Sequence, residues 1–229
     1  FGVFLPTDKP DRADIPPVPD IAALVKDYKG DTTMTAGEAF DPTPANIDAR
    51  TVRSELPSGL KLALLPKATR GQTVSGTIRV HFGTEQGLSG KATTASLAGA
   101  MLMRGTTAHT RLQLKDEFDR LKAQVGLRGT AEGVTVSFTT VRANLPAVLR
   151  LAGEVLRQAS FDSTEFVTLQ RERLAALESQ RTDPIALAQT ALARATQAYA
   201  PGHPRYVSTI EERIANTQAV TVADAKRFW

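Results

Sequence analysis

The chain has 229 residues, a formal net charge of +4 and no cysteine. It is long enough to bury a sizeable hydrophobic core, and the absence of cysteine excludes disulfides, thiolate catalysis and cysteine-ligated zinc. Aromatic residues make up only 6% of the chain and the basic residues are scattered over predicted helix faces rather than gathered in a stripe, so nucleic-acid binding is not indicated. No apolar run reaches the roughly 18 residues of a membrane helix, and we expect no membrane span and no signal peptide in the sequence as it stands.

Residues 1–50 differ in composition from the rest of the chain. They contain 7 of the 13 prolines and 5 Lys/Arg against 9 Asp/Glu, whereas the later residues contain 23 Lys/Arg against 15 Asp/Glu. Proline enrichment and weak apolar periodicity predict a linker. One short helix is predicted within it, from Ile21 to Tyr28, with Asp20 as its N-cap and Gly30 after its end.

Both termini indicate a piece of a longer protein. The chain does not begin with Met, and Phe1 to Leu5 reads as the last strand of a preceding unit. The final residues, Arg227 to Trp229, fall inside a helix predicted to begin at Thr221. We therefore expect that a signal peptide, if the whole protein has one, lies outside this sequence.

Alternating apolar and polar residues predict a first group of strands after the linker. They are Thr51–Leu56, Leu60–Leu65 and Gln72–Phe82. The first two flank a Pro-Ser-Gly turn and should form a hairpin. In the third, Val80 and His81 fall on opposite faces, and an exposed strand position explains His81 better than a metal ligand does.

The middle of the chain adds helices and a second strand pair. The glycine-rich loop Gly83–Gly90 lacks the Lys-Ser/Thr ending of a phosphate-binding loop, so nucleotide binding is not expected. The predicted elements that follow are a small-residue helix at Thr93–Thr106, a helix capped by Thr110 and stopped by Gly126, and strands Leu127–Glu132 and Val134–Val141 joined at Gly133.

The last third of the sequence is predicted to be helical. The helices are Leu145–Ala159, Ser163–Gln180 and Pro184–Ala200, then one begun by Ser208 with Glu211 and one begun by Thr221 with Asp224. Asp162 and Asp183 are N-cap residues for two of them. Strands that precede a run of helices favour an α+β fold, in which helices pack on one face of an antiparallel sheet.

Three motifs resemble the pitrilysin/insulinase family of zinc metallopeptidases. Met101–Thr106 reads Met-Leu-Met-Arg-Gly-Thr, Thr110 and Arg111 follow it, and Pro201–Tyr206 reads Pro-Gly-His-Pro-Arg-Tyr. In that family a Met-Leu-x-x-Gly-Thr segment follows a helix with the zinc motif His-x-x-Glu-His. The resemblance covers about residues 51–229.

Laid on the family pattern, the zinc motif is degenerate in this chain. The two histidines fall on Ser96 and Ala100, and the catalytic glutamate falls on Gly99. Zinc requires nitrogen, oxygen or sulfur ligands and the glutamate acts as general base, so none of the three residues supplies the chemistry. The third ligand falls near Ala176 or Glu178, and a single carboxylate does not hold zinc. We expect no catalytic residue, cofactor or metal in this chain, and we expect Glu178 to be a surface residue.

The resemblance implies a mitochondrial processing peptidase-like metallohydrolase fold, in which four modules form two halves around a chamber. It implies that residues 1–50 link the halves and that residues 51–229 are an inactive third module, truncated at its C-terminus. The parent would be a zinc metalloendopeptidase with zinc in its catalytic half. We expect this module to complete the substrate chamber and to bind peptide at exposed strand edges, in the periplasm or outside a bacterium. Its partners would be the catalytic half and peptide substrate.

Two other functions remain open. The same fold without ligands serves as a scaffold subunit in respiratory complexes, which implies a structural or assembly role as an alternative. An enzyme of another type would use Ser96 as a nucleophile with His109 or His203 as its base. Ser96 lies in the middle of a helix among alanines rather than on a nucleophile elbow, so the sequence supports this last function least.

Overall fold

The computed structural model describes residues 20–27 and 35–229. The chain divides into two units, Phe1–Met34 and Thr35–Trp229, and each is described by itself. The second unit starts inside the predicted linker and contains all of the described strands.

In the first unit, helix α1 (Ile21–Val25) starts where the sequence predicts. The carboxylate of Asp20 accepts a hydrogen bond from the amide of Ala22 at 3.0 Å, as an N-cap should. The helix ends earlier than predicted, and the residues that were expected to end it, Tyr28 and Gly30, lie outside the described residues, as does the strand expected at Phe1–Leu5.

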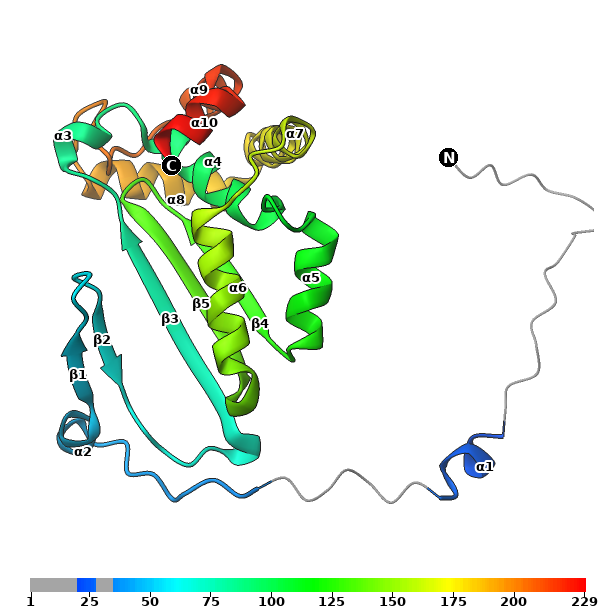
Figure 1. The fold of residues 1–229 in the computed structure, drawn as a ribbon. Coiled ribbons are helices and arrows are strands. Elements are labelled where there is room, and N and C mark those ends of the chain that lie inside the picture. Colours follow the sequence, from blue (N-terminus) through cyan, green and yellow to red (C-terminus); the bar gives the residue numbers. More distant parts are fainter. Residues whose placement is uncertain (1–19, 28–34) are drawn as a thin grey trace, which may run out of the picture. The chain divides into compact units, whose positions relative to one another are not determined.

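The second unit combines helices with two antiparallel sheets (Figure 1). Its strands are β1 (Val52–Glu55), β2 (Lys61–Leu64), β3 (Thr73–His81), β4 (Gln124–Gly129) and β5 (Gly133–Val141). Its α-helices are α2 (Pro44–Arg50), α3 (Glu85–Leu88), α4 (Ala92–Met101), α5 (Arg111–Arg120), α6 (Leu145–Arg157), α7 (Ser163–Gln180), α8 (Pro184–Thr196), α9 (Ile210–Ala219) and α10 (Val222–Phe228). Short 3₁₀ helices lie at η1 (Arg70–Gln72), η2 (Leu102–Arg104) and η3 (Arg142–Asn144).

The larger sheet has three strands in the order β3-β5-β4, and β1 with β2 forms the predicted hairpin. Strand β5 is central, so Val136 faces Ile78 of β3 on one side and Leu127 of β4 on the other. Alternate residues of β5, such as Val136 and Phe138, are buried on one face, whereas Ser137 on the other face is exposed. We call these the helix face and the open face of the sheet.

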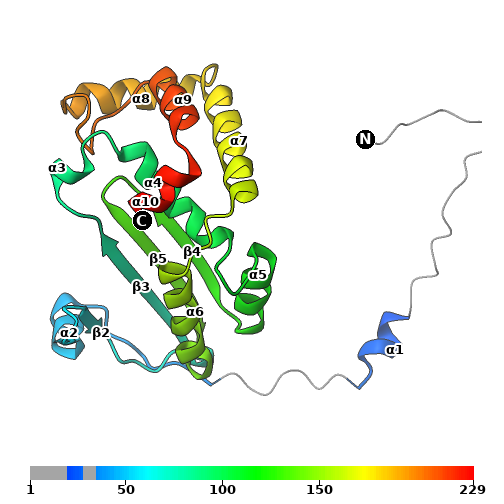
Figure 2. The ribbon, with the colours of Figure 1, turned by 45° about the horizontal axis from the view of Figure 1, so that its top comes forward.

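Helices α4, α5 and α6 cover the helix face (Figures 1 and 2): α4 and α5 contact β4, and α6 packs on β5. The core between them includes Leu97, Met101, Leu114, Phe118, Val134, Val136, Val148 and Val155. A smaller cluster, Leu177 with Ile210 and Ile214, joins α7 to α9. The structure confirms the predicted α+β fold with helices on one face of an antiparallel sheet.

The boundary between α5 and β4 is a correction to the sequence analysis. The helix ends at Arg120, and Val125, predicted to be helical, pairs with Phe138 in the sheet. Lys122 has a positive φ of 50°, which reverses the chain before the strand begins. Gly126 therefore lies within β4, and Gly133 is the first residue of β5 rather than a turn.

Other boundaries also differ. The capping box of α9 uses Thr209 and Glu212 rather than Ser208 and Glu211. Helices α2 and α3 were not predicted, and the small-residue helix begins at Ala92 and ends before the predicted Thr106. Helix α8 ends at Thr196 instead of Ala200.

Candidate functional site

Helix α4 and strand β4 touch through their backbones where the family motif would place a glutamate. A Cβ atom on Gly99 would lie 2.8 Å from Cα of Gly129 and 3.2 Å from Cγ2 of Val134. A Cβ atom on Gly129 would lie 2.9 Å from Cα of Gly99. Contacts this short do not occur between real side chains and backbone, so only glycine fits at both positions with this packing.

The other motif positions do not assemble a metal site either. Ser96 and Ala100 are half-buried on α4, and Ala100 has no ligand atom. Glu178 is an exposed residue of α7 that pairs with Arg181 at 3.2 Å, as predicted. Within residues 20–27 and 35–229, no group of three His, Asp or Glu side chains is placed to hold a metal ion. These residues do not fit a zinc ion.

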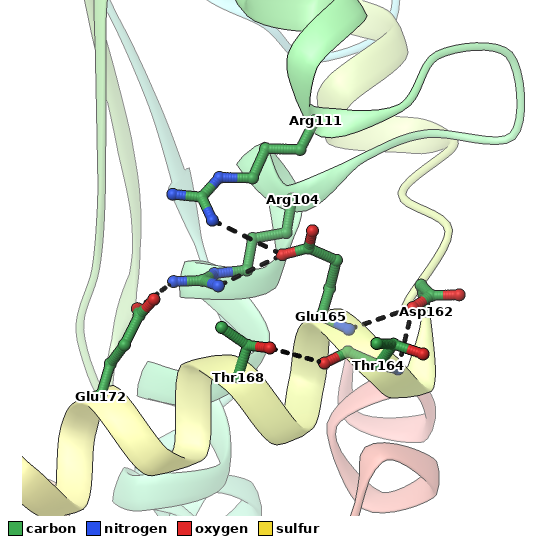
Figure 3. A network of polar contacts seen from close by, with 7 residues as sticks. All are labelled: Arg104, Arg111, Asp162, Thr164, Glu165, Thr168 and Glu172. Carbon is green, nitrogen blue, oxygen red and sulfur yellow. Dashed lines mark hydrogen bonds and ion pairs between the residues drawn. The ribbon is translucent and has the colours of Figure 1, made fainter. Parts of the chain in front are cut away.

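The segment that follows α4 attaches this helix to α7 through a buried arginine (Figure 3). Arg104 in η2 has a side chain only 9% exposed, and its guanidinium contacts Glu165 at 3.2 Å and also Glu172. Arg111 at the start of α5 reaches the same Glu165 oxygen at 3.6 Å. Asp162 caps α7 by accepting from the amides of residues 164 and 165. The arginines of the two resembling motifs therefore have a structural role, because both converge on one glutamate.

A second polar cluster fixes the loop between η2 and α5 to α6. The Thr106 hydroxyl donates to the Glu154 carboxylate, and Nδ1 of His109 lies 2.7 Å from the same oxygen. Burial disfavours the ionised carboxylate, but the hydrogen bonds from Thr106 and His109, with the charge of His109, hold the pKa of Glu154 below its usual value.

The residues of the proposed serine mechanism are not brought together. His109 is bound to Glu154 on α6, and Nε2 of His203 lies 3.2 Å from Glu85 on α3. In the part of the chain that the structure describes, neither histidine hydrogen-bonds to Ser96. Nucleophilic catalysis requires a base that contacts the nucleophile. The structure places neither histidine in that position relative to Ser96.

A groove that the sequence analysis did not find runs between α5 and β4. Its volume is about 640 Å³, and Met103, Leu114, Phe118 and Val125 contribute apolar lining. Arg111 and Glu165 lie at a polar part of its wall. Residues of β4 line this groove. In the described sheet β4 pairs only with β5, so the other edge of β4 lies beside the groove.

No protein family model and no curated protein matches the chain. Its fold, in contrast, is similar to several solved structures. A peptidase M16 inactive domain from Pseudomonas fluorescens matches with a TM-score of 0.60 and 21% identity, over 78% of this chain and 42% of that one. The chain has the fold of an M16 peptidase module.

Two proteases have this M16-type fold in common with the chain. A protease from Helicobacter pylori matches with a TM-score of 0.64 and 16% identity, over 78% of this chain and 42% of that one. The periplasmic protease PqqL from Escherichia coli matches with a TM-score of 0.56 and 17% identity, over 84% of this chain and 20% of the PqqL chain. The chain thus spans less than half the length of each of these structures. None of its described helices is long and apolar enough to cross a membrane.

Proposed function

We propose that this M16-type chain is a non-catalytic module of a larger zinc peptidase of the pitrilysin/insulinase type. It completes the wall of the substrate chamber and binds peptide without cleaving it, while zinc and the catalytic residues reside in another half of the parent. The single observation that carries the proposal is the packing of Gly99 against Gly129. This contact leaves no space for a glutamate side chain at the position onto which the family motif places the general base. Ser96 and Ala100 at the two histidine positions agree with it.

The groove beside β4 is the proposed peptide site. The outer edge of β4 offers backbone donors and acceptors to an extended peptide, which is the usual basis of strand addition. Alternate side chains of an added strand would point toward the helix face, where Val125 and Phe118 give the groove an apolar wall. The family resemblance implies peptide binding at strand edges in general, and the groove favours the edge of β4 over that of β3.

The catalytic half of the same parent is the proposed partner, and the periplasm or the exterior of a bacterium is the proposed location. Support comes from the similar structures, which are longer than this chain, and from the periplasmic location of PqqL.

Fluorescence anisotropy with a labelled, unstructured peptide tests peptide binding by this chain. We expect saturable binding, no cleavage on prolonged incubation, and weaker binding of the same peptide N-methylated at alternate residues, because strand addition requires the peptide N–H groups. Absence of binding to any extended peptide would overturn the peptide-binding role and favour the structural or assembly role. Cleavage by the purified chain would contradict the non-catalytic assignment.

A further inference from the structure

The open face of the three-stranded sheet is polar and carries no acidic residue. Its residues come from alternate positions of the three strands and are Thr73, Ser75, Thr77, Arg79, His81, Gln124, Gly126, Arg128, Gly133, Thr135, Ser137, Thr139 and Val141. Hydroxyl groups dominate this face, and Ser75 and Thr139 approach each other at 3.2 Å across β3 and β5. The charged residues of the face are both arginines.

Arg79 and Arg128 lie in one row across the sheet. Each is the direct cross-strand neighbour of Thr135, Arg79 from β3 and Arg128 from β4. Two strand spacings separate their Cα atoms by about 10 Å, so both long side chains can reach the surface above Thr135. Both residues are exposed.

These two guanidinium groups have no acidic partner in the described chain. The ion pairs within residues 20–27 and 35–229 involve other basic residues, such as Arg104, Arg181 and Arg205. An arginine fork matches a carboxylate through two parallel hydrogen bonds. The face thus presents two free carboxylate-binding groups surrounded by hydroxyls.

We infer that Arg79 and Arg128 select acidic side chains of an extended peptide bound to this module. The inference rests on the proposed function and adds the substrate class. A strand added to the edge of β4 would point alternate side chains to the open face, where one of them would be a cross-strand neighbour of Arg128. Arg79, two strands farther along the same row, would add its positive charge at longer range. Its other side chains would face the groove. The recognised peptide therefore has acidic residues on one face and apolar residues on the other.

The test compares two labelled peptides of alternating pattern, one with glutamates and one with glutamines facing the open side. We expect the purified chain to bind the glutamate peptide about three- to tenfold more tightly at low salt, as suits exposed charge pairs. The preference should shrink as salt screens the charges. In the double variant Arg79→Gln, Arg128→Gln the two peptides should bind equally.

The double variant Arg150→Gln, Arg171→Gln is the matched control. It removes the same charge from exposed positions on helices α6 and α7, and it should keep the preference for glutamate. Equal loss of preference in both double variants would reduce the effect to net charge and overturn the inference.

The remaining outcomes separate the inference from the proposed function. Equal binding of both peptides to the unmodified chain would overturn the acidic selection and leave peptide binding intact. No binding of either peptide would overturn both. Sedimentation of the chain alone tests whether a second copy, rather than a peptide, covers the open face. A dimer that dissociates in the Arg79→Gln, Arg128→Gln variant would assign this face to a second copy.

Discussion

At the scale of single residues, Gly99 and Gly129 set the distance between α4 and β4. The residues lie thirty positions apart in the sequence, yet a side chain on either one would overlap the backbone of the other. Gly99 is also the position onto which the resemblance would place a general base. Under the proposed function, close packing between a helix and a sheet occupies that position.

Substitution Gly99→Ala tests this packing. The added methyl must push α4 away from Gly129, and we expect the free energy of unfolding to fall by about 1–3 kcal/mol. Gly153→Ala in α6 is the control, because a Cβ atom there would meet nothing within 4 Å, and alanine should stabilise that helix by up to about 1 kcal/mol. Urea denaturation of both variants gives the comparison. Equal stability of the two would contradict the close contact.

Glu154 gives the second residue-scale prediction, which concerns acid stability. Its pKa in the folded protein lies below the usual 4.5, so the ionised carboxylate stabilises the fold above that pH. This contribution is lost as the pH falls through the folded-state pKa.

Measured by urea denaturation between about pH 6 and pH 3, the free energy of unfolding should fall less steeply in Glu154→Gln than in the unmodified chain. Thr106→Val removes one of the hydrogen bonds to the carboxylate and should give an intermediate slope. Identical slopes for all three proteins would show that the cluster does not lower the pKa of Glu154.

At the scale of secondary-structure elements, one arginine connects η2 with two turns of α7. Arg104 is buried and its carboxylate partners are half-exposed or exposed, so its removal leaves Glu165 with the more distant Arg111 and Glu172 with solvent. Because hydrogen bonds between charged groups contribute more to stability than neutral ones, we expect the docking of α7 to depend on Arg104.

We expect Arg104→Met to lower the free energy of unfolding by about 1–3 kcal/mol and to speed hydrogen exchange of the α7 amides. Arg181→Met, at the C-cap of α7, is the control, because its pair with Glu178 is exposed and should contribute no more than about 0.5 kcal/mol. If both variants were equally stable, the Arg104 network would be a surface feature without a role in docking.

Elements with local signals were predictable from the sequence. Asp162 begins α7 and Thr221 begins α10 as predicted, because an N-cap depends on residues only two or three positions away. At α9 the sequence contains two overlapping capping-box patterns, of which the structure forms the one with Thr209 and Glu212. The start at Thr209 places Ile210 in the core, where it is 4% exposed.

The α5–β4 boundary and the groove depended on contacts that sequence periodicity does not contain. Leu121 and Val125 fit both a helical spacing of four and a strand alternation of two, and only the pairing of Val125 with Phe138 decides for the strand. The groove joins Met103, Phe118, Val125 and Glu165 from four separate segments. The proposed degenerate motif, in contrast, could be located in the sequence because its positions directly precede the single short segment Met101–Thr106.

At the scale of the whole molecule, the chain has the fold of a peptidase module and covers 42% of an M16 inactive domain structure from Pseudomonas fluorescens. Under the proposed function, its groove, the edge of β4 that no described strand pairs and its pair of arginines would act together with a catalytic partner that supplies zinc. Such a division of labour would require no ligand atoms at Ser96, Gly99 and Ala100.

The zinc content of the purified chain, measured by metal analysis after dialysis against micromolar zinc and then against metal-free buffer, tests this division most directly. We predict close to zero zinc per chain, because the residues at the motif positions supply no complete ligand set. One tightly held zinc per chain would contradict the non-catalytic assignment, and it would show that His81, His109 or His203 takes part in a site formed by another arrangement of the chain.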